Sequence, residues 1–193
     1  MPGQPVLIVV AGPNGAGKTT FAERVASETG LEFVNADVIA AERWPGDEAD
    51  RAYEAAAVAA ARRAELIATS RSFATETVFS HRSKVDLVRA AVSGGYLVHL
   101  HAVMVPEDLA VARVGIRARL GGHDVPAERI RARYRRLWAL VAEAAGLCAE
   151  ARFYDNSSAR HPFRPVAEFD SGMPVRHPDW PDWAPPELLA LTR

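Results

Sequence analysis

The sequence predicts an α/β fold in which a parallel sheet of about five strands carries helices on both faces. Short apolar segments rich in β-branched and aromatic residues alternate along the chain with longer segments of helical periodicity, a pattern that is typical of parallel sheets. The first apolar segment runs directly into a glycine-rich loop and then a helix. Further along, two arginine-rich helical segments are separated by a short glycine-containing turn, which indicates a helical lid over one edge of the sheet.

The glycine-rich loop is the most specific motif in the chain. It follows the apolar run at residues 6–11, whose β-branched residues suit a strand buried on both faces of a sheet. Gly12, four further residues, and then Gly17, Lys18 and Thr19 have the spacing of a P-loop. Backbone N–H groups of such a loop, together with the N-terminal end of the following helix, bind phosphate groups. The motif therefore predicts a P-loop NTPase fold.

Individual loop residues have expected parts in nucleotide binding. We expect the Lys18 ammonium to be exposed, to reach the β- and γ-phosphates and to act in catalysis, and the Thr19 hydroxyl to ligate Mg²⁺. The alternative, a glycine-rich turn that arose by chance, is disfavoured because a strand precedes the loop and a helix follows it. The residues expected to contact the nucleotide are Gly12, Pro13, Asn14, Gly15, Ala16, Gly17, Lys18, Thr19 and Thr20.

The later segments continue the alternation of strands and helices. Strands are expected within residues 31–37, 72–80, 96–105 and 151–157, and helices within 44–70, entered through Pro45 and Gly46, and 82–93. Residues 161–193 form a proline-rich tail, in which 163–176 predict a hairpin that turns at 170–172. A chain of 193 residues suits one α/β domain, so we expect a single domain over residues 1–193.

Polar side chains stand at the ends of three expected strands, where ligands of open α/β sheets bind. Asp37 follows the second strand and could accept the proton of an attacking hydroxyl group; alternatively, it caps the helix that follows. Glu76 ends the third strand and could contact the metal, its water shell or a substrate; alternatively, it is solvated or pairs with Arg82. Asn156 ends the fifth strand and is expected to bind the nucleotide.

Residues 106–145 form the expected lid. Pro106 and Pro126 begin two helices, and Gly121 with Gly122 supplies a hinge between them. Closure of such a lid would exclude water from the site.

The lid is rich in arginine, which binds phosphate oxygens through a planar and permanently charged fork. Residues 113–138 contain eight arginines and two carboxylates. One alternative is a solvated helix face, which we favour for Arg129, Arg135 and Arg136. The other is a nucleic-acid patch, which is disfavoured because few aromatic residues are interleaved with the arginines.

Composition limits the classes of function. The formal net charge of −1 gives no overall attraction to nucleic acid or to an anionic membrane. Cys148 is the only cysteine, so we expect a buried thiol and no disulfide or cysteine zinc site. No signal peptide or membrane-spanning run is present, which favours a cytoplasmic location without a membrane partner. His99 and His101 lack partners at metal-ligand spacing, whereas His123 in the lid turn is a candidate substrate contact.

Five motifs occur in order between residues 6 and 158: AGPNGAGKTTFA, FVNAD, FATETVFSHR, RVGIRARLGGHDVPAERIRARYRR and YDNSS. Through them the chain resembles the zeta toxin family of P-loop kinases, in particular its short single-domain members. The resemblance implies a kinase-type P-loop fold that uses ATP and Mg²⁺ and transfers the γ-phosphoryl group to a hydroxyl group. In characterised zeta toxins the acceptor is a UDP-N-acetylamino sugar.

The same resemblance gives functions to single residues. It implies that Asp37 activates the acceptor hydroxyl and that Arg117 and Arg133 are catalytic lid arginines alongside Lys18. The candidates for substrate binding are Asp37, Glu76, Thr77, Arg82 and His123.

The sequence thus predicts an ATP-dependent kinase whose acceptor is a small hydroxylated molecule, with a UDP-N-acetylamino sugar as the first candidate. The alternatives are a kinase of another acceptor, such as a polynucleotide end or an antibiotic, and a nucleotide-binding regulatory module that turns over slowly. A GTPase switch is disfavoured because the chain lacks an Asn-Lys-x-Asp run. An antitoxin protein is a candidate partner, whereas nucleic acid is not expected to be one.

Overall fold

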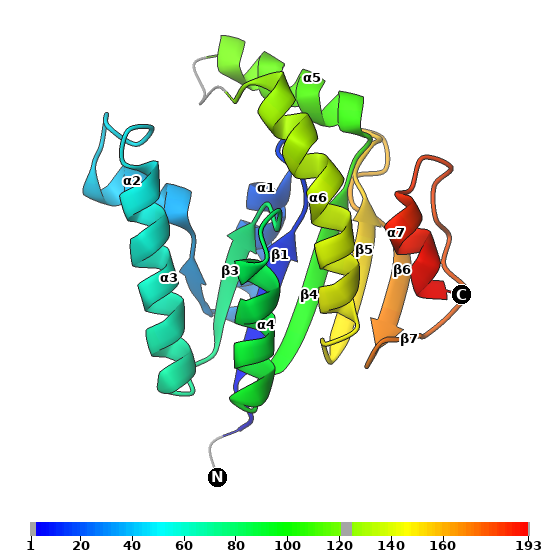
Figure 1. The fold of residues 1–193 in the computed structure, drawn as a ribbon, viewed down its shortest axis with the longest axis horizontal. Coiled ribbons are helices and arrows are strands. Elements are labelled where there is room, and N and C mark those ends of the chain that lie inside the picture. The colour runs from blue at the N-terminus through cyan, green and yellow to red at the C-terminus, as the bar shows by residue number, and fades with distance from the viewer. Residues whose placement is uncertain (1–2, 121–124, 193) are drawn as a thin grey trace.

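The strands form one sheet in the order β2-β3-β1-β4-β5-β6-β7 in the computed structural model, which describes residues 3–120 and 125–192 (Figure 1). The first five strands in this order are parallel, and β6 and β7 extend the sheet as an antiparallel hairpin. The strands are β1 (Val6–Ala11), β2 (Glu32–Val34), β3 (Phe73–Thr77), β4 (Leu97–Met104), β5 (Glu150–Asp155), β6 (Arg164–Asp170) and β7 (Met173–Pro174). The predicted α/β fold with about five parallel strands is therefore confirmed, as is the hairpin within 163–176.

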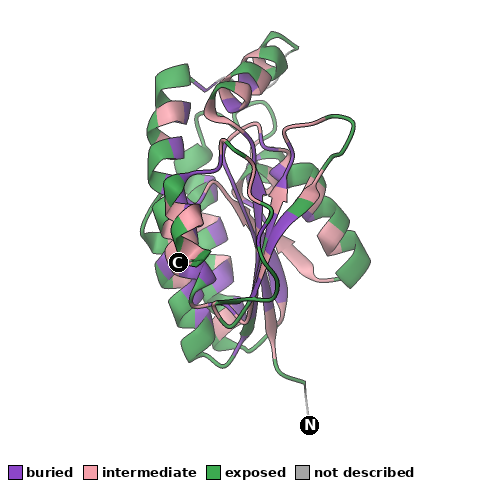
Figure 2. Ribbon diagram, turned by 90° about the vertical axis from the view of Figure 1, so that its right-hand side faces the viewer, coloured by how far each residue is buried: buried purple, intermediate pink, exposed green. Residues whose placement is uncertain are grey.

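Helices lie on both faces of this sheet. In Figure 1, α3, α4 and α6 lie in front of the strands and α1 lies behind them, and Figure 2 shows the sheet between the two layers. The helices are α1 (Lys18–Thr29), α2 (Ala36–Arg43), α3 (Ala52–Ala68), α4 (Ser83–Ser93), α5 (Glu107–Arg119), α6 (Ala127–Ala145) and α7 (Pro186–Leu189), followed by a 3-10 turn at Ala190–Thr192. Among the residues that the structure describes, no helix has the length and apolar character that crossing a membrane requires.

Three local features differ from the sequence-based expectation. The helix expected over 44–70 begins at Ala52, and the segment before it consists largely of turns. Gly46 has a φ of +93°, a left-handed conformation that cannot continue a right-handed helix. The short helix α7 was not predicted, and a helix at α2 entered only as the alternative for Asp37, because each is too brief to show a clear helical period.

The core lies in two layers, one on each face of the sheet. Along β1, Leu7, Val9 and Ala11 belong to the larger layer, which also receives Trp138 from α6. Val10 points the other way, into a smaller layer that includes residues of α1 and α5. This alternation follows from the two-residue period of a strand. It makes β1 a rigid, doubly covered support for the loop that follows it.

Gly12 fixes the path of the chain where β1 ends. A Cβ atom at this position would lie 2.2 Å from the backbone oxygen of Val103 in the neighbouring strand β4, which is well inside van der Waals contact. Only glycine therefore lets the P-loop leave β1 so close to β4. The loop begins at the carboxyl edge of the sheet, where β2, β3 and β5 also end.

Candidate active site

The P-loop lies between β1 and α1 and forms one wall of a cavity of about 300 Å³. Gly17 caps α1 in the left-handed conformation, with a φ of +88°, and no side chain caps this helix end. The first backbone N–H groups of α1 are thus left for a ligand, as expected of an anion site at a helix start. We call this space the phosphate cavity; its P-loop lining consists of Asn14, Gly15, Gly17, Lys18, Thr19 and Thr20.

Lys18 is buried rather than exposed, which corrects the sequence-based expectation. Its side chain is 7% exposed, its Nζ atom donates a hydrogen bond to the Pro13 carbonyl at 3.0 Å, and the same atom lies 3.6 Å from Oε1 of Glu76. Burial lowers the pKa of Lys18, while the neighbouring Glu76 carboxylate raises it. The ammonium group is therefore held at the phosphate cavity by two oxygen partners.

Asn35 joins the two carboxylates that the sequence singled out. Its Nδ2 atom donates to Oε2 of Glu76 at 2.9 Å, and its Oδ1 atom accepts from the backbone N–H of Asp37 at 2.7 Å. Asn35 is thus the cap of α2, so the alternative in which Asp37 caps this helix is wrong. The second alternative for Glu76 is wrong as well, because the Arg82 guanidinium pairs with Glu143 instead.

Asp37 lies in the first turn of α2 with an exposed side chain. Among the described residues, its carboxylate has neither a hydrogen-bond donor nor an ion-pair partner. It lines the phosphate cavity and two further spaces. The carboxylate is therefore accessible to a ligand from more than one side, as a proton acceptor for a bound hydroxyl group must be.

The second space surrounds the end of β3, and we call it the β3 cavity. It has a volume of about 300 Å³, and its lining includes Asn35, Asp37, Glu76, Thr77 and Arg133. Asp37 and Glu76 line the phosphate cavity as well. The two carboxylates therefore stand at the boundary between the P-loop and a second cavity that can hold a small molecule.

Two arginines of the expected lid line cavities of the candidate site. Arg117 of α5 lines the phosphate cavity, and Arg133 of α6 lines the β3 cavity. Together with Asp37 they also border a third space of about 410 Å³ beneath the two helices. Burial lowers the pKa of Arg133, as do the nearby positive charges of Arg129 and Arg136.

The remaining arginines of α6 behave differently from Arg133. Arg131 pairs with Glu107 and Asp108 at the start of α5 and so connects the two helices. The solvated face expected for Arg129, Arg135 and Arg136 is confirmed, since all three are exposed. The Gly121–Gly122 hinge and His123 lie outside the described residues.

Asn156 supports the P-loop from behind, and its predicted contact with the nucleotide stays a prediction. Its Nδ2 atom donates to the Ala16 carbonyl at 2.8 Å, and its Oδ1 atom accepts from the backbone N–H of Phe163 at 3.2 Å. Both ends of the amide are used, and the residue is 9% exposed. A Cβ atom on Gly17 would lie 2.7 Å from that Nδ2 atom, so the contact requires glycine in the loop.

Two of the predicted substrate-binding residues, Thr77 and Arg82, lie in different surroundings. Thr77 lines the β3 cavity, and its Oγ1 atom also accepts a hydrogen bond from the backbone N–H of Phe79 at 3.2 Å. That bond supports a turn in which Phe79 has a φ of +61°. Arg82 lines none of the three cavities, because its side chain lies against α6 through Glu143.

The oxygen groups at the P-loop fit a magnesium nucleotide. The Thr19 side chain is exposed and lines the phosphate cavity beside Asp37 and Glu76, and hydroxyl and carboxylate oxygens are the ligands that Mg²⁺ prefers. The Oδ1 atom of Asn14 is buried and has no partner among the described residues. Such an atom is costly unless a ligand or water satisfies it.

Sequence reasoning missed several residues of the site. Asn35 was overlooked because its contact with Glu76 joins positions 41 residues apart. Arg113 lines the phosphate cavity and donates to the Asn156 carbonyl at 3.0 Å; its position one turn before Arg117 was the available signal. Arg63 and Lys84 line the β3 cavity, and no local motif marks either of them.

Comparison with known proteins identifies the family of this chain. A family model described as an AAA domain matches residues 7–140, which is more than half of the chain and includes the P-loop, both carboxylates and most of the lid. No curated protein has a matching sequence.

Solved structures of low sequence identity share the fold. A chain from the PezAT chromosomal toxin–antitoxin system of Streptococcus pneumoniae has a TM-score of 0.65 and 16% identity, covering 86% of this chain and 71% of that one. A chain of the AvrRxo1-ORF1:-ORF2 complex with ATP has a TM-score of 0.69 and 17% identity, and the match covers 91% of this chain and 61% of that one. A chain of the Pnkp1/Rnl/Hen1 RNA repair complex has a TM-score of 0.57 and 18% identity, and the match covers 86% of this chain and 49% of that one. At these identities the likeness concerns the fold alone.

Proposed function

Because this chain belongs to the AAA domain family, we propose that it is an ATP-dependent kinase that transfers the γ-phosphoryl group of ATP to a hydroxyl group of a small molecule. One observation carries the proposal. Asp37 and Glu76 line the phosphate cavity and the β3 cavity at once. In a phosphoryl transfer the attacking hydroxyl and the γ-phosphate must meet in line, and the shared wall of these two cavities is where they can do so.

The residues around this wall have separate functions in the proposed reaction. Lys18 and the backbone N–H groups at the start of α1 hold the β- and γ-phosphates. Asp37 accepts the proton as the acceptor oxygen forms its bond to phosphorus, and the bond from phosphorus to the bridging oxygen breaks to leave ADP. Arg117 and Arg133 stabilise the charge that is redistributed over the phosphoryl oxygens. When bound through Thr19, Mg²⁺ neutralises charge on the phosphates.

Glu76 supports these groups rather than accepting the proton itself. Its two oxygens face Lys18 at 3.6 Å and Asn35 at 2.9 Å, so both are already engaged. In that position it orients the Lys18 ammonium and fixes the end of β3. This arrangement leaves Asp37, whose carboxylate has no partner among the described residues, as the general base.

We propose a zeta toxin-like acceptor, a UDP-N-acetylamino sugar, as the first substrate candidate. The support is the ordered set of five motifs and the shared fold with a chain of the PezAT toxin–antitoxin system. An antitoxin protein that covers the site belongs to the same proposal. The fold shared with a chain of an RNA repair complex keeps a polynucleotide end as the second candidate.

The experiment that tests the function is a search for the phosphorylated product. The protein is incubated with ATP, Mg²⁺ and a metabolite extract, and mass spectrometry identifies any compound that gains a phosphoryl group. The expected result is one product that is absent with Asp37→Asn. ATP hydrolysis with no phosphorylated metabolite would instead favour the slow regulatory module. Oligonucleotide phosphorylation that weakens steeply with salt would favour the second candidate.

A further inference from the structure

The β3 cavity is lined by cations as well as by carboxylates. Arg63 of α3, Lys84 of α4 and Arg133 of α6 line it together with Asp37 and Glu76. His81 and Ser80 add polar groups at the turn after β3. The cavity therefore offers a carboxylate that it shares with the phosphate cavity, Asp37, and positive charge contributed by three different helices.

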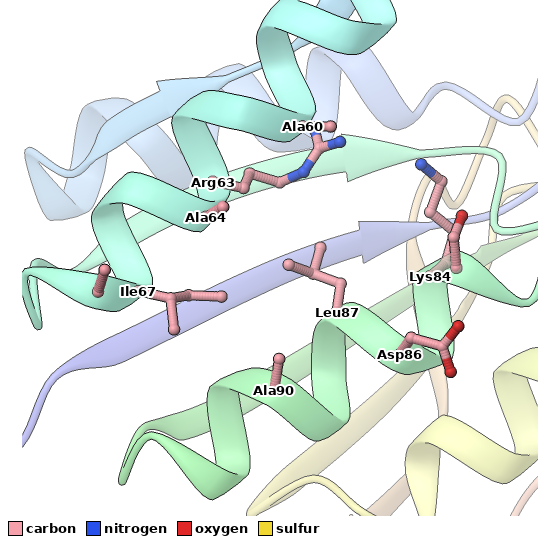
Figure 3. Close-up of a pocket in the computed structure, with 10 residues that line it drawn as sticks. Ala60, Arg63, Ala64, Ile67, Lys84, Asp86, Leu87 and Ala90 are labelled. Carbon is pink, nitrogen blue, oxygen red and sulfur yellow. The ribbon is translucent and has the colours of Figure 1, made fainter.

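Arg63 is the most unusual of these cations. It is only 8% exposed, yet no carboxylate of the described residues forms an ion pair with it, although Asp37 and Glu76 share its cavity and Asp86 lines the adjoining groove. Burial lowers its pKa. Figure 3 shows Arg63 and Lys84 extending from α3 and α4 toward the same end of the groove between these helices. Burial lowers the pKa of Lys84 as well, and the positive charge of Arg63 lowers it further.

A buried guanidinium beside a half-buried ammonium, with no ion-pair partner among the described residues, is costly for the folded protein. A buried cation loses its hydration and normally regains the lost energy from an opposite charge and hydrogen bonds. The carboxylates in the same cavity do not supply this compensation, because Glu76 pairs with Lys18 and Asp37 lies within salt-bridge distance of no cation in the described residues. A bound anion would satisfy both cations at once.

We propose that Arg63 and Lys84 form an anion subsite for a phosphate group that the acceptor already carries, separate from the phosphoryl group that is transferred. A guanidinium fork and a point-like ammonium together match a dianionic phosphate, whereas one carboxylate would leave a positive charge unbalanced. The inference rests on the proposed function and narrows it. The acceptor has a hydroxyl group for Asp37 at one end and a phosphate group at the other.

The surroundings of the subsite allow two sources of this phosphate. The β3 cavity alone, at about 300 Å³, suits a molecule of the size of a sugar phosphate. Arg63 and Lys84 also line the adjoining α3–α4 groove of about 420 Å³, whose walls include Ile67 and Leu87. A nucleotide sugar would place its diphosphate at the two cations and extend its remaining part into this groove.

The subsite can be tested without any turnover. The protein is first saturated with Mg²⁺ and the non-hydrolysable analogue AMP-PNP, so that the P-loop cannot take up the probe. Inorganic phosphate is then added at constant ionic strength, and binding is measured by calorimetry. We expect one phosphate site in the nucleotide-loaded protein. Parallel titrations with glucose, glucose 6-phosphate and UDP-N-acetylglucosamine identify the source, since only the phosphate-bearing compounds should bind through this site.

Two variants and one control connect this binding to the named residues. Arg63→Gln and Lys84→Gln should each weaken phosphate binding by about tenfold or more, because a charge-assisted hydrogen bond is lost, while AMP-PNP affinity stays unchanged. Arg176→Gln removes an exposed positive charge outside these cavities and should leave phosphate binding unaffected. Asp37→Asn should also retain phosphate binding, even though it stops the proposed transfer.

Thermal unfolding separates a binding function of Arg63 from a structural one. Phosphate should raise the Tm of the wild-type protein but not that of Arg63→Gln, and Arg63→Gln should not lower the Tm in phosphate-free buffer. If Arg63→Gln does not fold, Lys84→Gln decides the question from a different helix. The proposal is overturned if AMP-PNP-loaded protein binds no phosphate or if both foldable variants bind it as the wild type does. Failure of the kinase reaction alone would leave this result untouched.

Discussion

The Nδ2 atom of Asn35 donates a hydrogen bond to Oε2 of Glu76 at 2.9 Å, across the ends of two neighbouring strands. The other oxygen of that carboxylate lies 3.6 Å from the Lys18 ammonium, and the other atom of the Asn35 amide caps the helix that carries Asp37. One buried asparagine therefore connects the P-loop lysine, through Glu76, to the helix that carries Asp37, the proposed general base. This connection holds Lys18 and the start of the helix that carries Asp37 in a fixed relation.

Replacing Asn35 should affect stability and catalysis together. Asn35→Ala removes the cap of α2, at a cost of about 1 kcal/mol, and leaves one Glu76 oxygen without its donor. Asn35→Asp keeps a capping oxygen but places a second carboxylate against Glu76. We expect Asn35→Asp to lower kcat more than it raises the KM for ATP, as measured by steady-state kinetics. Equal kinetics in Asn35→Asp and the wild type would contradict the proposed coupling.

Lys18→Ala should abolish phosphoryl transfer while the fold is retained. Among the described residues, the buried ammonium has no partner other than Pro13 and Glu76. Its removal takes away the charge that we propose stabilises the β- and γ-phosphates. Product formation is followed by mass spectrometry, and folding by circular dichroism. A variant that keeps its turnover would remove the P-loop from the mechanism.

Asp37→Asn should spare ATP binding and lower the transfer rate by about a hundredfold or more, the usual scale for a lost general base. Since Asn35 rather than Asp37 caps α2, the substitution should leave the Tm nearly unchanged. Nucleotide affinity, Tm and rate are measured on the same preparation. A large fall in Tm with an unaltered rate would show that the carboxylate acts in folding and not in catalysis.

His101 should make the protein less stable in mild acid. Burial, with nearby Arg152 and His99, lowers the pKa of His101 from 6.5 to about 4. Between these two values the unfolded chain binds more protons than the folded one, so the free energy of unfolding falls as the pH decreases from 6.5 to 4 and then changes no further through this group. The full loss is about 3 kcal/mol. Urea unfolding at pH 7 and at pH 4.5 measures most of this loss in the free energy of unfolding.

A matched pair of variants assigns this pH effect. His101→Gln should reduce the stability difference between the two pH values, whereas His161→Gln, at an exposed position in the tail, should not. An undiminished difference in His101→Gln would mean that other groups cause the acid sensitivity.

The sequence carried enough information for the sheet and the P-loop because both depend on local patterns. The run at residues 6–11 and the spacing from Gly12 to Thr19 lie within one short segment, and the chain path around them follows from strand period and glycine geometry. The strand ends also correctly located Asp37 and Glu76, since carboxyl ends of parallel strands share one edge.

The missing parts of the site depend on tertiary contacts. No sequence pattern indicated that the Asn156 amide supports the P-loop, because its partners Ala16 and Phe163 are visible only in the structure. Arg63 lies on an alanine-rich helix with nothing local to distinguish it from the neighbouring Arg62, which pairs with Glu32. Which of two adjacent arginines faces a cavity is decided by how α3 packs on the sheet.

The lid supplies the final prediction. Arg117 borders the phosphate cavity and Arg133 the β3 cavity, so lid closure would direct both guanidinium groups at the phosphoryl group in transfer. Replacing either with Lys keeps the charge but loses the planar fork. We expect kcat to fall by about tenfold to a thousandfold, with a much smaller change in ATP affinity, because the contact is strongest in the transition state.

Exposed arginines on the same helix provide the control for this experiment. Arg135→Lys and Arg136→Lys alter residues that line neither of these two cavities, and they should leave kcat within about twofold of the wild-type value, as expected for surface substitutions. Rates are compared at two salt concentrations. If Arg135 and Arg136 mattered as much as Arg117 and Arg133, and activity fell steeply as salt increased, the arginines would act as an extended surface for a polyanion. The lid mechanism would then be abandoned in favour of nucleic-acid recognition.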